Sequence, residues 1–276
     1  MKNIQSKSLL SLIIIPFIIG FSTSAKDIIG VNATNFSDSS TDSVSKPLAD
    51  VLNAKYAHSV AYPASLQEHR DESKSYVKKY SKNERSYIIY MFNRGKKYFP
   101  KMANIFEDYD VPQEMRMLPA LESNFSANAV SRAGAVGYWQ FMGELAREYG
   151  LHTGGKSDER KNFLKSTVAA AKYFRDQLDF FNNDILLTVA SFNCGQGGVR
   201  SAIKKSNVSN PDFWDIKQYL PNETRIFVMK FIALNVISAN YEQFLKGKLN
   251  FNTPPAIQLA LADTSGSSDI TSASAL

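Results

Sequence analysis

The sequence predicts an all-α protein, and three observations support that class. Apolar residues recur at spacings of three and four along three stretches, which is the period of one helix face. These stretches are 88–109, 168–181 and 226–237. No stretch alternates apolar and polar residues in the manner of a half-buried strand. The glycines gather in clusters at 134–137, 154–155 and 195–198, where loops turn tightly or let a ligand approach the backbone.

Each periodic stretch predicts one main helical element. Pro100 lies inside the first stretch and predicts a kink or a break, because proline removes a backbone donor. After the second stretch, Asn183 or Asp184 can cap a short helix. The third stretch is apolar nearly all round, so we expect it to be the central buried helix.

The two ends of the chain differ in composition from its middle. Residues 1–25 hold two lysines, a short apolar run and small residues up to Ala25, which is typical of a signal peptide. Residues 26–60 are rich in Ser, Thr, Asp and Asn and predict a flexible linker, and 251–276 predict a low-complexity tail. We therefore expect one domain at 61–250 in a protein exported to the periplasm or cell envelope. An uncleaved membrane anchor is the alternative for the first segment.

Charge and composition exclude several classes of partner. The net charge is +6, from 32 basic and 26 acidic residues, which is too little on its own to indicate a nucleic-acid partner. The single cysteine, Cys194, excludes an intramolecular disulfide and a cysteine-rich zinc site. The three histidines lie far apart without metal-ligand spacing. We expect neither a metal nor a cofactor.

Glu122 is the candidate catalytic acid. It follows an apolar run that contains Pro119 and lies between Leu121 and Phe125, so its carboxyl is expected to be partly desolvated. Desolvation disfavours the charged form and raises the pKa, as a general acid at neutral pH requires. Taken alone, a glutamate in such a place is more often a solvated or salt-bridged surface residue.

Two glycine-rich loops accompany this glutamate. The small-residue loop 131–137 runs directly into Tyr138-Trp139-Gln140-Phe141, and aromatic rings with an amide are what a sugar-binding groove needs. The alternative is that Trp139 and Phe141 are core residues. A second turn at 193–198 either caps a helix or directs Asn193 toward the groove.

Together these residues resemble the lysozyme-like lytic transglycosylases with a family-one catalytic domain. Four blocks match in order over about residues 80–245: Glu122-Ser123, 131–142, 190–197 and 220–228. The resemblance implies a lysozyme-like helical domain with a substrate groove. It also implies cleavage of the β-1,4 bond between N-acetylmuramic acid and N-acetylglucosamine in peptidoglycan glycan strands, leaving 1,6-anhydromuramoyl ends.

The resemblance assigns Glu122 as the catalytic residue and implies substrate-side positions in the matching blocks. These are Ser123, Ser131, Tyr138, Gln140, Phe192, Asn193 and Phe227. Local hydrogen bonds that shape a turn are the alternative role for the polar members. Phe192 and Phe227 stand where the family usually has Tyr, which leaves the rate, the pH optimum and the substrate choice open.

Two other functions stay open from the sequence. A true hydrolase of lysozyme type needs a second carboxylate, for which Glu144, Asp158 and Glu159 are the nearby candidates. A murein-binding or wall-assembly protein with a decayed site is the non-enzymatic alternative. We expect Glu223 and Arg225 to form a structural ion pair or a helix cap. Peripheral association with the envelope, oligomeric state, physiological role and endo or exo cleavage are left undecided.

Overall fold

The computed structural model describes residues 59–252. The predicted signal peptide, nearly all of the predicted linker and the tail from residue 253 onward lie outside the described residues. The chain divides into two compact units, one containing Tyr62–Tyr241 and the other, among described residues, 59–61 and 242–252. The candidate site lies wholly in the first unit.

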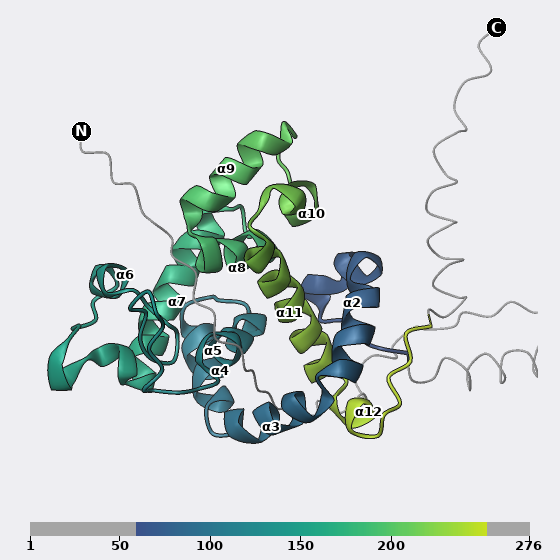
Figure 1. Ribbon diagram of the computed structural model, residues 1–276, viewed down its shortest axis with the longest axis horizontal. Helices are drawn as coiled ribbons and strands as arrows, with labels where there is room; N and C mark the ends of the chain where they lie inside the picture. Colours follow the sequence, from purple (N-terminus) through teal and green to yellow (C-terminus); the bar gives the residue numbers. More distant parts are fainter. Residues whose placement is uncertain (1–58, 253–276) are drawn as a thin grey trace, which may run out of the picture. The chain divides into compact units, whose positions relative to one another are not determined.

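The described residues are mostly helical, which confirms the predicted class (Figure 1). The α-helices are α2 (Arg70–Asn83), α3 (Arg85–Gly95), α4 (Phe99–Asp108), α5 (Leu118–Ser123), α6 (Gly143–Glu148), α7 (Phe163–Phe180), α8 (Ile185–Cys194), α9 (Gln196–Ser206), α10 (Phe213–Ile216), α11 (Asn222–Ala239) and α12 (Tyr241–Leu245). Short 3-10 helices are η1 (Ala64–His69), η2 (Gln113–Met117), η3 (Gly155–Ser157), η4 (Glu159–Lys161) and η5 (Lys217–Tyr219). Extended pairing within 59–252 is limited to isolated bridges, two of them in the loop 130–141.

Pro100 breaks the first periodic stretch, as predicted. Helix α3 ends at Gly95, and α4 begins at Phe99 with Pro100 in its first turn. Proline is tolerated there because the backbone N–H of a first-turn residue has no partner within the helix. A turn closed by Tyr98 N donating to Gly95 O at 2.8 Å connects the two helices.

Helices α7 and α8 confirm the second prediction. The Asp184 side chain accepts a hydrogen bond from the Leu187 backbone N–H at 2.8 Å and caps α8. Asn183 instead adopts a left-handed backbone conformation, with φ of 63°. The sharp turn between α7 and α8 therefore uses both polar residues, one for the cap and one for the reversal.

Helix α11 is the central helix. Its residues from Val228 to Ile237 are almost all buried, and it packs against α2, α8 and α5. Figure 1 shows α11 crossing between α2 and α8. Ile226 near its start is 40% exposed, so the helix is buried all round only in its later turns.

Trp139 and Phe141 are both core residues. Each is 1% exposed, and the Trp139 indole donates a hydrogen bond to Thr167 Oγ1 at 3.2 Å. The Trp139 ring also meets Phe106 and Phe174. The interpretation of these two rings as core residues is therefore confirmed. In the part of the chain that the structure describes, no helix is long and apolar enough to cross a bilayer.

Candidate active site

Glu122 lies in the last turn of α5, a helix that Pro119 begins and two left-handed residues end. Asn124 and Phe125 have φ of 55° and 54°. An aromatic residue rarely adopts this conformation, so the surrounding packing must hold it. The Phe125 ring is 1% exposed, stacks on Tyr98 with centroids 5.1 Å apart and meets Phe99 edge-on. This packing fixes the backbone that follows Glu122.

The carboxyl of Glu122 favours its protonated form. Burial, and next to it the negative charge of Glu223, raises the pKa of Glu122 from 4.5 to about 8. Among the described residues, no hydrogen bond or ion pair reaches this carboxyl to oppose the shift. A carboxyl in these surroundings holds its proton at neutral pH and can donate it.

Glu223 is the second carboxyl of the site, and the sequence assigned it a different role. The predicted ion pair or cap with Arg225 is wrong. Within residues 59–252, Glu223 Oε2 and Arg225 Nε are both buried without a hydrogen-bond partner, and the residue before α11 has no side-chain cap. Burial raises the pKa of Glu223, while Lys230 opposes that shift. Packing of α11 on α5 brings the charge of Glu223 to Glu122.

Ser123 ties α5 to the loop that follows. Its hydroxyl donates to the Tyr138 carbonyl at 2.7 Å and accepts from the Ser126 backbone N–H at 3.2 Å. The Tyr138 ring packs edge-on against Tyr98 and Phe163, and burial raises the pKa of Tyr138 to about 12. Ser123 and Tyr138 thus position the start of the loop segment 138–142 next to the helix that carries Glu122.

Ser131 and Gln140 shape the loop 131–142. Ser131 Oγ accepts from the Ala135 backbone N–H at 3.0 Å. Gln140 Nε2 donates to the carbonyls of Ala129 and Gly137, at 3.2 and 2.9 Å. The Ser131 hydroxyl and the Gln140 amide are therefore engaged in local hydrogen bonds. Contact with the substrate stays a prediction for both residues.

Arg160 fixes this loop from outside, and the sequence did not single it out. Its guanidinium donates to the Phe141 carbonyl at 3.0 Å and pairs with Asp158 at 2.7 Å. The Arg160 backbone lies so close that a β-carbon on Gly137, where φ is 83°, would be 2.0 Å from the Arg160 carbonyl oxygen. Only glycine fits at position 137.

The three carboxylates suggested as partners for Glu122 have other environments. The Arg160 guanidinium lowers the pKa of Asp158 to about 2. Glu159 pairs with Lys165 and accepts from the His152 backbone N–H. Glu144 is exposed. Within the described chain, no group of three His, Cys, Asp or Glu side chains is arranged to hold a metal ion.

The block at 190–197 contributes Phe192 and Asn193. Asn193 Oδ1 accepts from Thr224 Oγ1 at 2.8 Å, which joins α8 to the first turn of α11 beside Glu223. The half-buried Phe192 ring packs on the core aromatic rings of Trp139, Phe141, Tyr173 and Phe174. Phe227 is half-buried on α11. The structure thus ties Asn193 to the turn of α11 that carries Glu223.

Comparisons with known proteins support the family resemblance. Residues 103–214 match the family model described as the transglycosylase SLT domain, which confirms the resemblance. The match includes Glu122, the loop 131–137 and Gly195, where α8 turns into α9, and it ends before Glu223.

Two curated relatives show the extent of the similarity. The chain is 35% identical over 176 residues to membrane-bound lytic murein transglycosylase D of Escherichia coli K12, which covers 63% of this chain and 38% of that protein. It is 28% identical over 132 residues to a putative tributyltin chloride resistance protein of Alteromonas sp. strain M-1, covering 48% of this chain and 64% of that protein. The chain therefore spans well under half the length of transglycosylase D.

A solved structure shows a partial likeness. An inactive mutant of lytic transglycosylase Slt from Pseudomonas aeruginosa superposes with a TM-score of 0.44 at 22% sequence identity. The likeness covers 56% of this chain and 25% of that one.

Proposed function

We propose that this chain is a peptidoglycan lytic transglycosylase with a lysozyme-like catalytic domain and Glu122 as its catalytic residue. The observation that carries the proposal is the raised pKa of Glu122, about 8, in a domain that matches the transglycosylase SLT family model. The proposed reaction cleaves the β-1,4 bond between N-acetylmuramic acid and N-acetylglucosamine. Its product carries a 1,6-anhydromuramoyl end.

The proposed mechanism uses one carboxyl twice. Protonated Glu122 donates its proton to the glycosidic oxygen as the bond from that oxygen to the muramoyl C1 breaks. The muramoyl N-acetyl group stabilises the positive charge that develops at C1. Ionised Glu122 then accepts the proton of the C6 hydroxyl, whose oxygen bonds to C1 and closes the anhydro ring. The tethered hydroxyl has a large proximity advantage over water, and Glu122 ends in its starting form.

Glu223 supports the first step through its charge, because a carboxyl that must donate a proton benefits from a neighbouring negative group. Two buried acceptor atoms also lack partners here, Glu223 Oε2 and Asn124 Oδ1, the latter two residues after Glu122. Buried acceptors are normally satisfied, so we expect hydroxyl or amide donors of the bound sugar to complete them.

A hydrolase of lysozyme type is the second candidate, and the pairing of Glu122 with Glu223 is the observation that favours it. Hydrolysis with two carboxyls requires one to donate a proton and the other to act on water or on the sugar. Glu223 replaces Glu144, Asp158 and Glu159 as the candidate for that second role. The non-catalytic murein-binding protein remains a third possibility that only an activity measurement removes.

A digest of purified murein sacculi tests all three functions. The full chain and its Glu122→Gln variant are incubated with sacculi, and the soluble fragments are read by mass spectrometry. Fragments one water lighter than hydrolysis products, absent from the variant's digest, are the expected result. Reducing-end fragments would establish a hydrolase. A folded protein that binds sacculi and releases nothing would establish a binding protein.

We also propose that the protein acts in the cell envelope. The curated relative at 35% identity is named as membrane-bound, and residues 51–250, with 28 basic and 20 acidic residues, favour approach to an anionic wall polymer. Export to the periplasm rests on the predicted signal peptide. Cell fractionation with an antibody tests it, since recovery of the processed protein with the cytoplasmic fraction would contradict it.

A further inference from the structure

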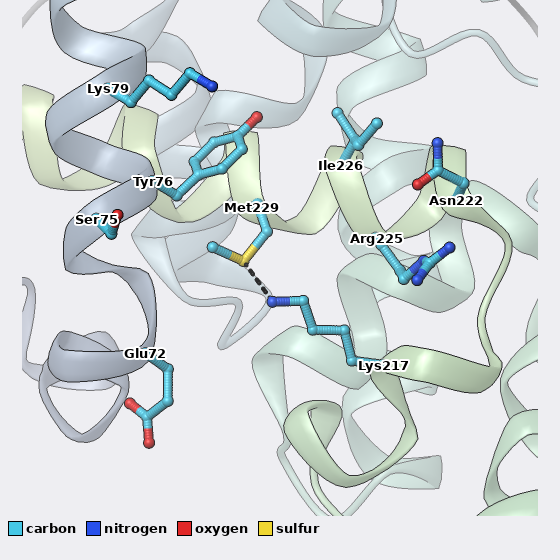
Figure 2. Close-up of a pocket in the computed structure, with 9 residues that line it drawn as sticks. All are labelled: Glu72, Ser75, Tyr76, Lys79, Lys217, Asn222, Arg225, Ile226 and Met229. Atoms are coloured by element: carbon cyan, nitrogen blue, oxygen red, sulfur yellow. Dashed lines mark hydrogen bonds between the residues drawn. The ribbon is translucent and has the colours of Figure 1, made fainter.

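A cleft lies between α2, η5 and α11. It has a volume of about 420 Å³ and is lined by residues of α2, η5 and α11. Figure 2 shows Tyr76 and Lys79 on α2, with Arg225 and Met229 on α11 opposite them and Lys217 reaching in from η5. Neither Glu122 nor Glu223 lines this cleft.

Two half-buried cations in the cleft have no acidic partner among residues 59–252. Lys217 Nζ lies 3.5 Å from Met229 Sδ and 4.4 Å from the centre of the Trp214 ring. Arg225 Nε is buried without a hydrogen-bond partner. The ion pairs among residues 59–252 include neither of these cations, and none includes Lys79. An unpaired charge taken out of water costs free energy, which a bound anion would recover.

The electrostatics of the pair agree with this geometry. Burial lowers the pKa of Lys217, and the positive charge of Arg225 lowers it further. The two like charges therefore repel one another across a partly dry surface. The only acidic residue that lines the cleft is Glu72, which is exposed on α2.

The rest of the lining combines the polar or charged Ser75, Lys79 and Asn222 with three apolar or aromatic side chains. Met229 is buried, Ile226 is 40% exposed and Tyr76 presents its ring from α2. A ligand that fits this surface carries carboxylates for Lys217 and Arg225 and an aliphatic portion for Met229 and Ile226. A short acidic peptide has that chemistry, whereas a neutral sugar does not.

We propose that this cleft binds a short peptide through its carboxylates, and that the peptide is the acidic stem attached to the muramoyl residues of murein. This second part rests on the proposed function. Helix α11 links the two sites, because residues 222, 225, 226 and 229 line the cleft while Glu223 lies on an adjacent face. A glycan held at Glu122 would then have its peptide recognised by an adjacent face of the same helix.

Binding of a synthetic tripeptide tests the proposal. The probe is L-alanyl-γ-D-glutamyl-diaminopimelate, titrated into the full chain by calorimetry and by Trp214 fluorescence at two salt concentrations. We expect Lys217→Gln and Arg225→Gln each to weaken the affinity by about tenfold, because each removes a charge-assisted contact. The affinity should fall as salt rises, and the tripeptide with amidated carboxyls should bind at least tenfold more weakly.

Matched variants separate charge from folding. Lys217→Arg keeps the charge and should bind within about twofold of the original chain. Lys101→Gln removes an exposed cation of α4 that does not line the cleft and should change nothing. Thermal unfolding of every variant checks that the fold persists.

Three results would overturn the inference. The tripeptide does not bind, or Lys217→Gln and Arg225→Gln bind it as tightly as the unaltered chain does. The third is that inorganic phosphate competes as strongly as the tripeptide. The sacculus digest is run on the same preparations. Anhydro products without tripeptide binding would remove the cleft proposal and leave the proposed function standing. Tripeptide binding that Lys217 and Arg225 control, without any cleavage, would support the cleft and remove the enzymatic role.

Discussion

Two pairs of charged residues beside the loop 131–142 illustrate opposite uses of burial. Glu122 is half-buried near Glu223, a group of the same sign, and its pKa rises to about 8. Asp158 is buried against Arg160, a group of opposite sign, and its pKa falls to about 2. Burial raises the pKa of Glu122 most and the charge of Glu223 adds to it, whereas at Asp158 the hydrogen bond from Arg160 outweighs burial.

The two pairs also differ in how well they are satisfied. Arg160 donates hydrogen bonds both to Asp158 and to the loop, so this pair serves the fold. In the other pair, Glu223 Oε2 is buried without a hydrogen-bond partner among the described residues, which costs stability and is typical of a site that needs a ligand.

The largest expected effect is at Glu122. Glu122→Gln should lower turnover by about a thousandfold, because proton transfer is lost. It should also raise the free energy of unfolding at pH 9 by about 3 kcal/mol, since a group whose folded pKa is raised loses its stabilising proton as pH rises through that value. Denaturant titrations at pH 5 and pH 9 measure this. An equally stable variant at pH 9 would show that the carboxyl is not desolvated.

The opposite effect is expected at Asp158. Asp158→Asn should lower the free energy of unfolding at pH 7 by about 3 kcal/mol, because Arg160 is left buried without its partner. The folded pKa is lowered, so this contribution is present above pH 4 and lost as pH falls toward 2. Glu159→Gln, at a more exposed ion pair, is the control and should change little. Equal losses from both variants would contradict the assignment.

A smaller effect, on pH dependence, is expected at Glu223. Glu223→Gln removes the negative charge that raises the pKa of Glu122, so that pKa should fall. The alkaline limb of kcat should then move to lower pH, because Glu122 loses its proton earlier. Lys230→Gln should move the limb less, since Lys230 acts on Glu223 rather than on Glu122. An unmoved limb in Glu223→Gln would exclude the electrostatic role.

The smallest effects are expected at the two phenylalanines that replace the family's tyrosines. The Phe192 ring packs on core aromatic rings, and Phe227 is half-buried on α11. Phe192→Tyr and Phe227→Tyr should therefore change kcat/KM by less than about threefold, within the range of a single neutral hydrogen bond. A tenfold gain in either variant, measured with sacculi, would show that the missing hydroxyl limits the reaction.

Local features of this fold could be predicted from the sequence. The break at Pro100, the cap at Asp184 and the buried α11 each follow from residues within one turn or one helix face. The desolvation of Glu122 was expected from its apolar neighbours for the same reason. Local chemistry determines such features, so a single sequence reveals them.

Features that depend on distant segments could not be predicted. Glu223 acts on Glu122 across about a hundred residues of chain, and only the packing of α11 on α5 brings them together. The ion pair between Glu223 and Arg225 was expected because the two residues are close in sequence. Residues two positions apart on a helix point to different faces, and the pair does not form. Their presence in the fourth matching block was the signal that both residues lie near the site.

The contact between Gly137 and the backbone of Arg160 restricts how this site can diversify. A side chain at position 137 would collide with the Arg160 backbone and displace the loop, whereas an exposed position such as Arg132 can exchange its side chain without moving the backbone. Sequences that evolve from this one can therefore change side chains of the loop near Glu122, but they must keep the backbone path of the loop at Gly137. Differences in substrate preference would then arise from side-chain changes on a loop whose backbone conformation stays the same.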